Sequence, residues 1–180
     1  MSKHADADLD LTKQAALREE VTTFLNHEAE LLDNQDLHDW LELVSEDVDY
    51  RVPVRVTRER GAESSEFSDE ANIFNEDYLS LDARVRRFDK EYAWSENPPT
   101  RMRRYVSNIR FEEINRDGDE LVVKSNLLIY RSKEDEVDAD LIAGERTDTL
   151  EREDGALKLT ERVVELDHTV LDTRPLSTFL

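Results

Sequence analysis

The sequence predicts an α+β fold in which N-terminal helices pack on a strongly curved, mostly antiparallel sheet. Two observations support this prediction: helical periodicity dominates the first half of the chain, and apolar and polar residues alternate through the second half. The expected order of helix, helix, strand, helix and four antiparallel strands is typical of α+β domains. At 180 residues the chain is long enough for one sizeable core. We therefore expect a flexible acidic tail over residues 1–11 and a single domain over residues 12–180.

The first expected elements are two amphipathic helices and a strand. Residues 12–32 repeat apolar side chains at helical spacing, with charged residues on the opposite face. Asp36 is expected to cap a second, short helix whose apolar face includes Trp40. Residues 48–54 then alternate as a strand. Pro53 places this strand at a sheet edge or a bulge, because proline cannot donate to a strand ladder.

A polar loop over residues 57–72 and a third helix over residues 74–92 are expected next. The helix should stop before Asn97-Pro98-Pro99, since a residue ahead of proline avoids helical geometry. Four long strands then complete the chain, and strands of this length predict strong twist and curvature. A curved sheet around helices forms a cone with a pocket, the arrangement of the NTF2-like (cystatin-like) superfamily. The strands are expected over residues 102–114, 120–130, 137–150 and 156–166, with hairpin turns at Asp117-Gly118 and Asp154-Gly155.

The composition excludes several classes of function. The chain has no cysteine, which rules out disulfides, thiolate catalysis and cysteine-ligated metals. Its net charge of −20 would repel nucleic acid and anionic membranes. An acidic, lysine-poor surface predicts a halophilic protein, and an ordinary acidic bacterial protein is the alternative. With no signal peptide and no apolar span, we expect a cytoplasmic protein.

Few side chains could support metal or phosphate chemistry. No two histidines have the i, i+3 or i, i+4 spacing that places two metal ligands on one helix face. The four glycines form no phosphate-binding loop. We therefore expect no catalytic, cofactor or metal site in this chain. The histidines are His4, His27, His38 and His168.

Acid/base catalysis inside the cone is the enzymatic alternative. Asp49, Tyr50 and Asp148 could supply proton-transfer groups, together with Asp167 and His168. Neighbouring strand residues point to opposite faces, so Asp167 and His168 would share one pocket only beyond the end of the strand. The other interpretation of this pair is a solvated acid beside a surface histidine.

An arginine-rich segment of balanced charge lies in the middle of this acidic chain. Residues 51–104 carry 11 basic and 11 acidic groups. Guanidinium groups bind carboxylates through paired hydrogen bonds. The segment therefore predicts either a contact with an acidic partner or ion pairs within the chain.

Two short blocks stand out in the second half of the chain, Trp94-Ser95-Glu96-Asn97-Pro98 and Val106-Ser107-Asn108. They resemble the Trp-x-Glu-Asn-Pro and Val-Ser-Asn blocks of the β (small) subunits of aromatic-ring-hydroxylating dioxygenases, in the branch acting on biphenyl, toluene or phenylpropionate-type substrates. The C-terminal region departs from the family pattern, with His168 where relatives commonly have glutamine. The resembling segments are Asp39–Leu43, Asp47–Val54, Leu81–Arg87, Ala93–Ile109 and Ala143–Leu150.

This resemblance implies a scaffold subunit in an α3β3 assembly, with the β chains associating as a trimer. The large α subunit would hold a Rieske [2Fe-2S] cluster and a mononuclear Fe(II), and a ferredoxin or reductase would supply electrons from NADH. That α subunit would add both atoms of O2 to an arene, giving a cis-dihydrodiol, and would set most of the substrate specificity. The alternatives are an autonomous cone enzyme, such as a dehydratase or isomerase, and a module that binds an apolar ligand without turnover.

We expect the arginine-rich segment and the apolar C-terminus to lie at a subunit contact. An exposed apolar end is unusual on so acidic a surface and is better explained if it is packed. The predicted contact residues are Trp94, Pro98, Arg101, Arg103, Arg104 and Phe179.

Overall fold

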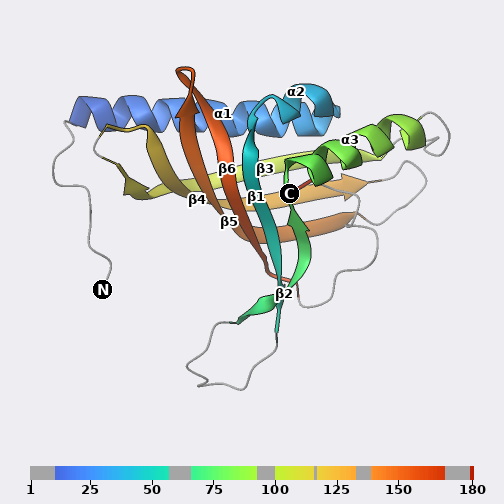
Figure 1. The fold of residues 1–180 in the computed structure, drawn as a ribbon. Helices are drawn as coiled ribbons and strands as arrows, with labels where there is room; N and C mark the ends of the chain where they lie inside the picture. Colours follow the sequence, from blue (N-terminus) through green and yellow to red (C-terminus); the bar gives the residue numbers. More distant parts are fainter. Residues whose placement is uncertain (1–10, 57–65, 93–99, 116, 133–138, 169–178) are drawn as a thin grey trace.

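Three helices and six strands make up the part of the chain that the computed structural model describes (Figure 1). The described residues are 11–56, 66–92, 100–115, 117–132, 139–168 and 179–180. In chain order the elements are α1 (Leu11–Asn34), α2 (Leu37–Leu41), β1 (Val44–Arg55), β2 (Phe67–Glu76), α3 (Tyr78–Tyr92), β3 (Arg101–Ile114), β4 (Glu120–Ser132), β5 (Asp140–Glu153) and β6 (Ala156–Leu166). No helix in these described ranges is long and apolar enough to span a membrane.

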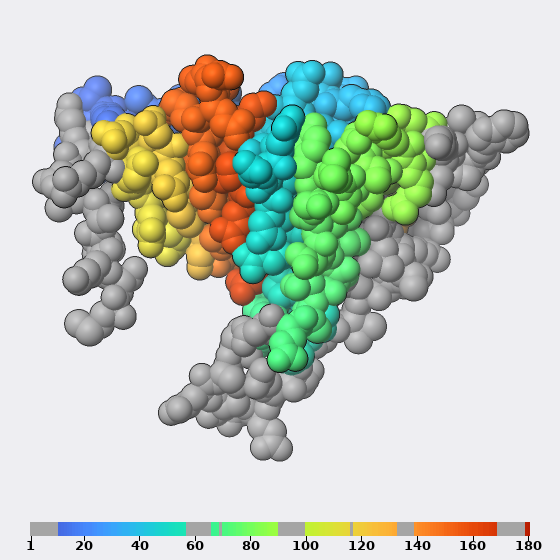
Figure 2. All heavy atoms as spheres, viewed as in Figure 1, coloured from blue at the N-terminus to red at the C-terminus, as the bar shows by residue number. Residues whose placement is uncertain are grey.

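The strands form one curved sheet in the order β2-β1-β6-β5-β4-β3. The β1–β6 pair is parallel and every other neighbouring pair is antiparallel. Figure 1 shows the sheet bending, with α1 running across its strands. Figure 2 shows β6, β1 and β2 lying side by side on the outer surface. The predicted α+β cone with helices on a mostly antiparallel sheet is confirmed.

The segment between β1 and α3 differs from the prediction. A polar loop to residue 72 and a helix from residue 74 were expected, but residues 67–76 form β2 and α3 begins at Tyr78. β2 pairs antiparallel with β1, where Val52 lies opposite Phe74. The helix start is set by Asp77, whose Oδ1 accepts the Ser80 N–H at 2.9 Å. Pairing with the preceding strand therefore decides the conformation of a segment that was predicted as loop to residue 72 and as helix from residue 74.

The turn and bulge predictions are largely confirmed. Asp154 and Gly155 both have positive φ, as a tight two-residue hairpin turn requires. Pro53 lies at a register shift in the β1–β2 pairing, so it occupies a bulge of an inner strand. Asp36 stands at the N-cap of α2, but its side chain makes no capping hydrogen bond.

The apolar core lies between the helices and the inner face of the sheet. Burial alternates along β4 and β5, as the two-residue period of a strand requires. Burying one large apolar side chain, such as a leucine or valine of these strands, stabilises the fold by roughly 1.5–3 kcal/mol. Phe179 and Leu180 are part of this core, although the residues before them lie outside the described ranges. Other fully buried members include Val21, Leu25, Leu81, Val85, Leu121, Ile129, Leu150 and Leu159.

Candidate functional site

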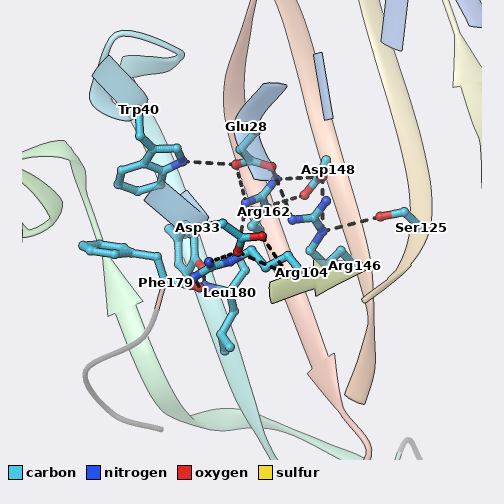
Figure 3. Close-up of polar contacts among 11 residues, drawn as sticks. Glu28, Asp33, Trp40, Arg104, Ser125, Arg146, Asp148, Arg162, Phe179 and Leu180 are labelled. Carbon is cyan, nitrogen blue, oxygen red and sulfur yellow. Dashed lines mark hydrogen bonds and ion pairs between the residues drawn. The ribbon is translucent and has the colours of Figure 1, made fainter. Parts of the chain in front are cut away.

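A cluster of four buried charged side chains lies in the interior of the cone (Figure 3). Glu28 comes from α1, Arg146 and Asp148 from β5, and Arg162 from β6. Arg162 makes paired hydrogen bonds to both carboxylates, at 2.7 and 2.9 Å to Glu28 and at 2.7 and 2.9 Å to Asp148. Arg146 contributes a further bond of 3.3 Å to Glu28. The cluster has two positive and two negative groups, so its formal charges cancel.

The arginines keep Glu28 ionised although it is fully buried. Burial by itself raises the pKa of the Glu28 carboxyl, but Arg162, Arg146 and the Trp40 Nε1–H bond outweigh it and lower that pKa to about 2. Burial lowers the pKa of Arg162, and the charges of Asp148 and Glu28 more than reverse this, raising it well above its usual value. Glu28 therefore exchanges no proton near neutral pH and acts as a fixed anion that ties α1 to the sheet.

A second buried ion pair joins α1 to β3. The Arg104 guanidinium donates to Asp33 at 2.8 Å, and Asp33 also accepts the Arg104 backbone N–H at 3.0–3.1 Å. Both side chains are almost fully buried. Burial lowers the pKa of Arg104, opposed by the Asp33 carboxylate. This pair orients the rest of the Arg104 guanidinium toward the centre of the cone.

Phe179 and Leu180 lie beside the two ion-pair groups and accept a hydrogen bond from each of them (Figure 3). The Tyr50 hydroxyl accepts the Leu180 N–H at 2.9 Å and donates to the Leu180 main-chain oxygen at 2.7 Å. Arg162 donates to that oxygen at 3.1 Å, and Arg104 donates to the Phe179 oxygen at 2.7 Å. Burial raises the pKa of the Tyr50 hydroxyl, opposed by the Arg162 charge. Tyr50 thus uses both its donor and its acceptor on Leu180.

The groups proposed for acid/base catalysis do not converge in the structure. Tyr50 and Asp148 are buried and hydrogen-bonded in the interior, whereas Asp49, Asp167 and His168 are exposed. Within the described ranges, no histidine lies inside the cone. Asp167 and His168 therefore agree with the second interpretation, a solvated acid beside a surface histidine.

One histidine–carboxylate hydrogen bond does exist, on the surface. His38 lies 3.0 Å from Asp89, and their side chains are 63% and 56% exposed. Asp89 lines a surface hollow of about 310 Å³ together with Gln35, Leu37 and Phe88. No cluster of three potential metal ligands occurs among the described residues.

The predicted contact residues separate into three groups. Arg101 and Arg103 are exposed on β3, and the Arg103 side chain is 65% exposed. Arg104 and Phe179 are buried, and the contacts described above hold them within the chain. The remaining two predicted contact residues, Trp94 and Pro98, lie outside the described residues.

Many arginines of the balanced middle segment pair with acids of the same chain. Arg55 reaches Glu66 at 2.6 Å and Arg86 reaches Asp82 at 2.8 Å. Of the two predictions for this segment, ion pairs within the chain are therefore confirmed for Arg55 and Arg86. Arg51 with Glu161 and Arg84 with Glu76 are further pairs.

The sequence prediction did not identify the interior ion pairs. A signal was available, because Glu28 falls on the apolar stripe of the first helix, seven residues after Val21. Arg146 and Asp148 likewise share the buried register of β5 with Ile142 and Leu150. A charged residue at a position predicted to face the core requires a buried partner.

Comparison with known proteins gives consistent similarities. The chain matches the family described as "Ring hydroxylating beta subunit" over residues 27–173. It is 35% identical to the small oxygenase component of the naphthalene 1,2-dioxygenase system of Ralstonia sp over 166 residues, covering 91% of this chain and 85% of that relative. It is 33% identical to the N,N-dimethyl phenylurea N-demethylase subunit beta of Sphingobium sp. (strain YBL2), covering 87% of this chain and 88% of the relative.

Solved structures show the same fold. A chain of naphthalene 1,2-dioxygenase with indole bound in the active site superposes with a TM-score of 0.78 at 32% identity, covering 92% of this chain and 86% of that one. A putative scytalone dehydratase from Novosphingobium aromaticivorans has a TM-score of 0.64 at 14% identity, covering 88% and 89%. The second likeness shows a shared fold alone.

Proposed function

This chain belongs to the family of ring-hydroxylating β subunits, and from that premise we propose that it is the structural subunit of a ring-hydroxylating dioxygenase whose chemistry occurs in a bound α subunit. In this proposal the α subunit carries the Rieske [2Fe-2S] cluster and the mononuclear Fe(II) and performs the cis-dihydroxylation of an arene. Three α and three β chains assemble, with the β chains forming a trimer in the cytoplasm.

The filled interior of the cone is the observation that supports a structural role. A cone enzyme needs an accessible base or acid beside a space for substrate. Here Tyr50 is engaged by Leu180, and Asp148 by Arg162. Phe179 packs next to them, with its ring centroid 4.6 Å from that of Trp40. The interior of the cone therefore acts as packing that supports the shape of the subunit.

An exposed apolar patch on the outer face of β3, β4 and β5 supports a subunit contact. Tyr105 lies opposite Leu128, and Tyr130 lies opposite Leu141 in the sheet register. All four side chains are among the exposed large apolar residues of the chain. An exposed group of this kind on so acidic a protein is typical of a protein–protein contact. Arg103, which pairs in register with Tyr130, lies on the same face.

The identity of the substrate is a property of the α subunit in this proposal. Two relatives of similar identity, 35% and 33%, belong to a naphthalene dioxygenase and to an N-demethylase. Similarity in the β chain therefore does not distinguish between these reactions. The acidic, lysine-poor composition supports a source that works in high salt.

Co-expression with an α subunit of a ring-hydroxylating dioxygenase from the same source organism tests the proposal. We expect a complex of α3β3 mass, with iron and arene oxidation in the complex and no iron in the purified β chain. Leu141→Asp should abolish assembly by placing a charge in the apolar patch, whereas Leu79→Asp, at a 75% exposed position on α3, should not. A β chain that remains monomeric beside its α subunit, or that binds iron and oxidises an arene alone, contradicts the proposal.

A further inference from the structure

The last two residues of the sequence lie in the cone as a ligand lies in a binding site. Three of their main-chain groups are hydrogen-bonded by side chains of the cone. Arg104 donates to the Phe179 oxygen, and the Tyr50 hydroxyl bonds to both the Leu180 N–H and the Leu180 oxygen. These partners come from β3 and β1, far away in the sequence. Peptide-binding proteins recognise ligands in this way, through main-chain hydrogen bonds and pockets for side chains.

The groups that hold Phe179 and Leu180 are positioned by other residues. Asp33 fixes Arg104 with bonds to both its guanidinium and its backbone N–H. Glu28 and Asp148 fix Arg162 with paired bonds. Because each buried guanidinium already has its carboxylate, the site does not depend on the two residues for charge neutralisation. The recognition groups are therefore built into the cone.

The pocket around the Phe179 side chain selects an aromatic ring. The ring centroid lies 4.6 Å from Trp40 and 5.9 Å from Phe88. The Arg84 guanidinium lies 4.3 Å above the ring, a cation–π contact. Two aromatic neighbours and one cation favour a flat π system over an aliphatic side chain of similar size.

We propose that the interior of the cone is a preformed peptide-binding site, selective for an aromatic residue followed by leucine, which the chain fills with its own Phe179 and Leu180. A chain that lacks these two residues binds the same peptide from solution. This site is separate from the subunit contact on the outer face of the sheet.

A deletion variant that ends at Thr178 tests the proposal, with the peptide N-acetyl-Ser-Thr-Phe-Leu as the probe. The variant should melt at a lower temperature than the full chain, and the peptide should raise its melting temperature in a concentration-dependent way. Calorimetry should show one site per chain, and the reversed peptide N-acetyl-Ser-Thr-Leu-Phe should bind at least about tenfold more weakly. The full chain should not respond, because its site is filled.

A matched pair of tyrosine variants in the deletion background locates the site. Tyr50→Phe removes the hydroxyl that makes two bonds to Leu180 and should weaken peptide binding about tenfold. Tyr130→Phe, at an exposed position on the outer face, should leave binding unchanged. A folded deletion variant that neither binds nor is stabilised by the peptide overturns the proposal, as does equal stabilisation of the full chain.

Phe179→Ala in the full chain provides a second test if the deletion variant fails to fold. This substitution keeps the main-chain bonds and empties only the ring pocket. Toluene should raise the melting temperature of Phe179→Ala and leave that of the unmodified chain unchanged. A folded Phe179→Ala variant without a toluene response shows that the pocket collapses, which overturns the proposal. The same conclusion follows if the deletion variant stays unfolded in saturating peptide and Phe179→Ala is unresponsive.

Discussion

Replacing Glu28 with glutamine tests the interior charge cluster most directly. Glu28→Gln keeps the shape of the side chain but removes one negative charge from the cluster. Arg162 and Arg146 then face only Asp148, so one buried positive charge lacks its partner. Removing one partner of a buried ion pair costs about 3–5 kcal/mol.

The lowered pKa of Glu28 leads to an effect of the same sign. A carboxyl pKa lowered from 4.5 to about 2 corresponds to about 3 kcal/mol of stability at neutral pH. Because the pKa in the folded chain lies below the value in the unfolded chain, this stability is present above pH 4.5 and is lost as the pH falls toward about 2. The loss of a buried ion-pair partner sets the magnitude, so we expect Glu28→Gln to lower the free energy of unfolding at pH 7 by about 3–5 kcal/mol.

Urea unfolding at a series of pH values between neutral and acidic measures this effect. The difference in the free energy of unfolding between the unmodified chain and Glu28→Gln should be greatest at pH 7. It should shrink as the pH falls below 4.5, because the stabilisation from the ionised Glu28 carboxylate is then progressively lost. Glu30→Gln, at a 71% exposed position on the same helix, is the control and should have no measurable effect. A difference below about 1 kcal/mol, as for an exposed pair, or a difference independent of pH would show that Glu28 is not held as a buried anion.

Three further predictions concern other parts of the chain. Arg104→Ala leaves Asp33 buried without its guanidinium and should lower the free energy of unfolding by about 3–5 kcal/mol in urea titrations, whereas Arg103→Ala should have little effect. Gly144→Ala should destabilise by about 1–3 kcal/mol in the same assay, because a Cβ there would lie 2.6 Å from the Glu165 carbonyl oxygen; a neutral result would show that β5 and β6 can separate locally. Raising KCl from about 0.1 M to about 1 M should raise the melting temperature, because salt shortens the screening length from about 10 Å to about 3 Å and weakens the repulsion of a −20 chain. A melting temperature that falls over this range would contradict the expected halophilic adaptation.

The sequence predicted the elements whose signal is local. The helix at Leu11–Asn34 and the hairpin at Asp154-Gly155 follow from apolar spacing and from residues that tolerate positive φ. β2 was missed because residues 67–72 are mostly polar and were predicted as a loop, while their strand conformation depends on pairing with β1. Family membership was predictable as well, because short blocks such as Trp94-Ser95-Glu96-Asn97-Pro98 carry it.

The side chains that meet inside the cone could not be predicted from local sequence patterns. Periodicity indicates that Glu28 and Arg162 face inward, but it does not indicate that they meet across 134 positions in the chain. Within the chain, Phe179 is buried with its ring centroid 4.6 Å from that of Trp40, a contact that no local pattern indicates. Its predicted place at a subunit contact stays a prediction. Local sequence patterns were therefore enough to predict every helix and strand except β2, the lack of cysteine ligands and the family. The pairing of buried charges and the filling of the cone depend on contacts between distant segments, which form only when the sheet curves around α1.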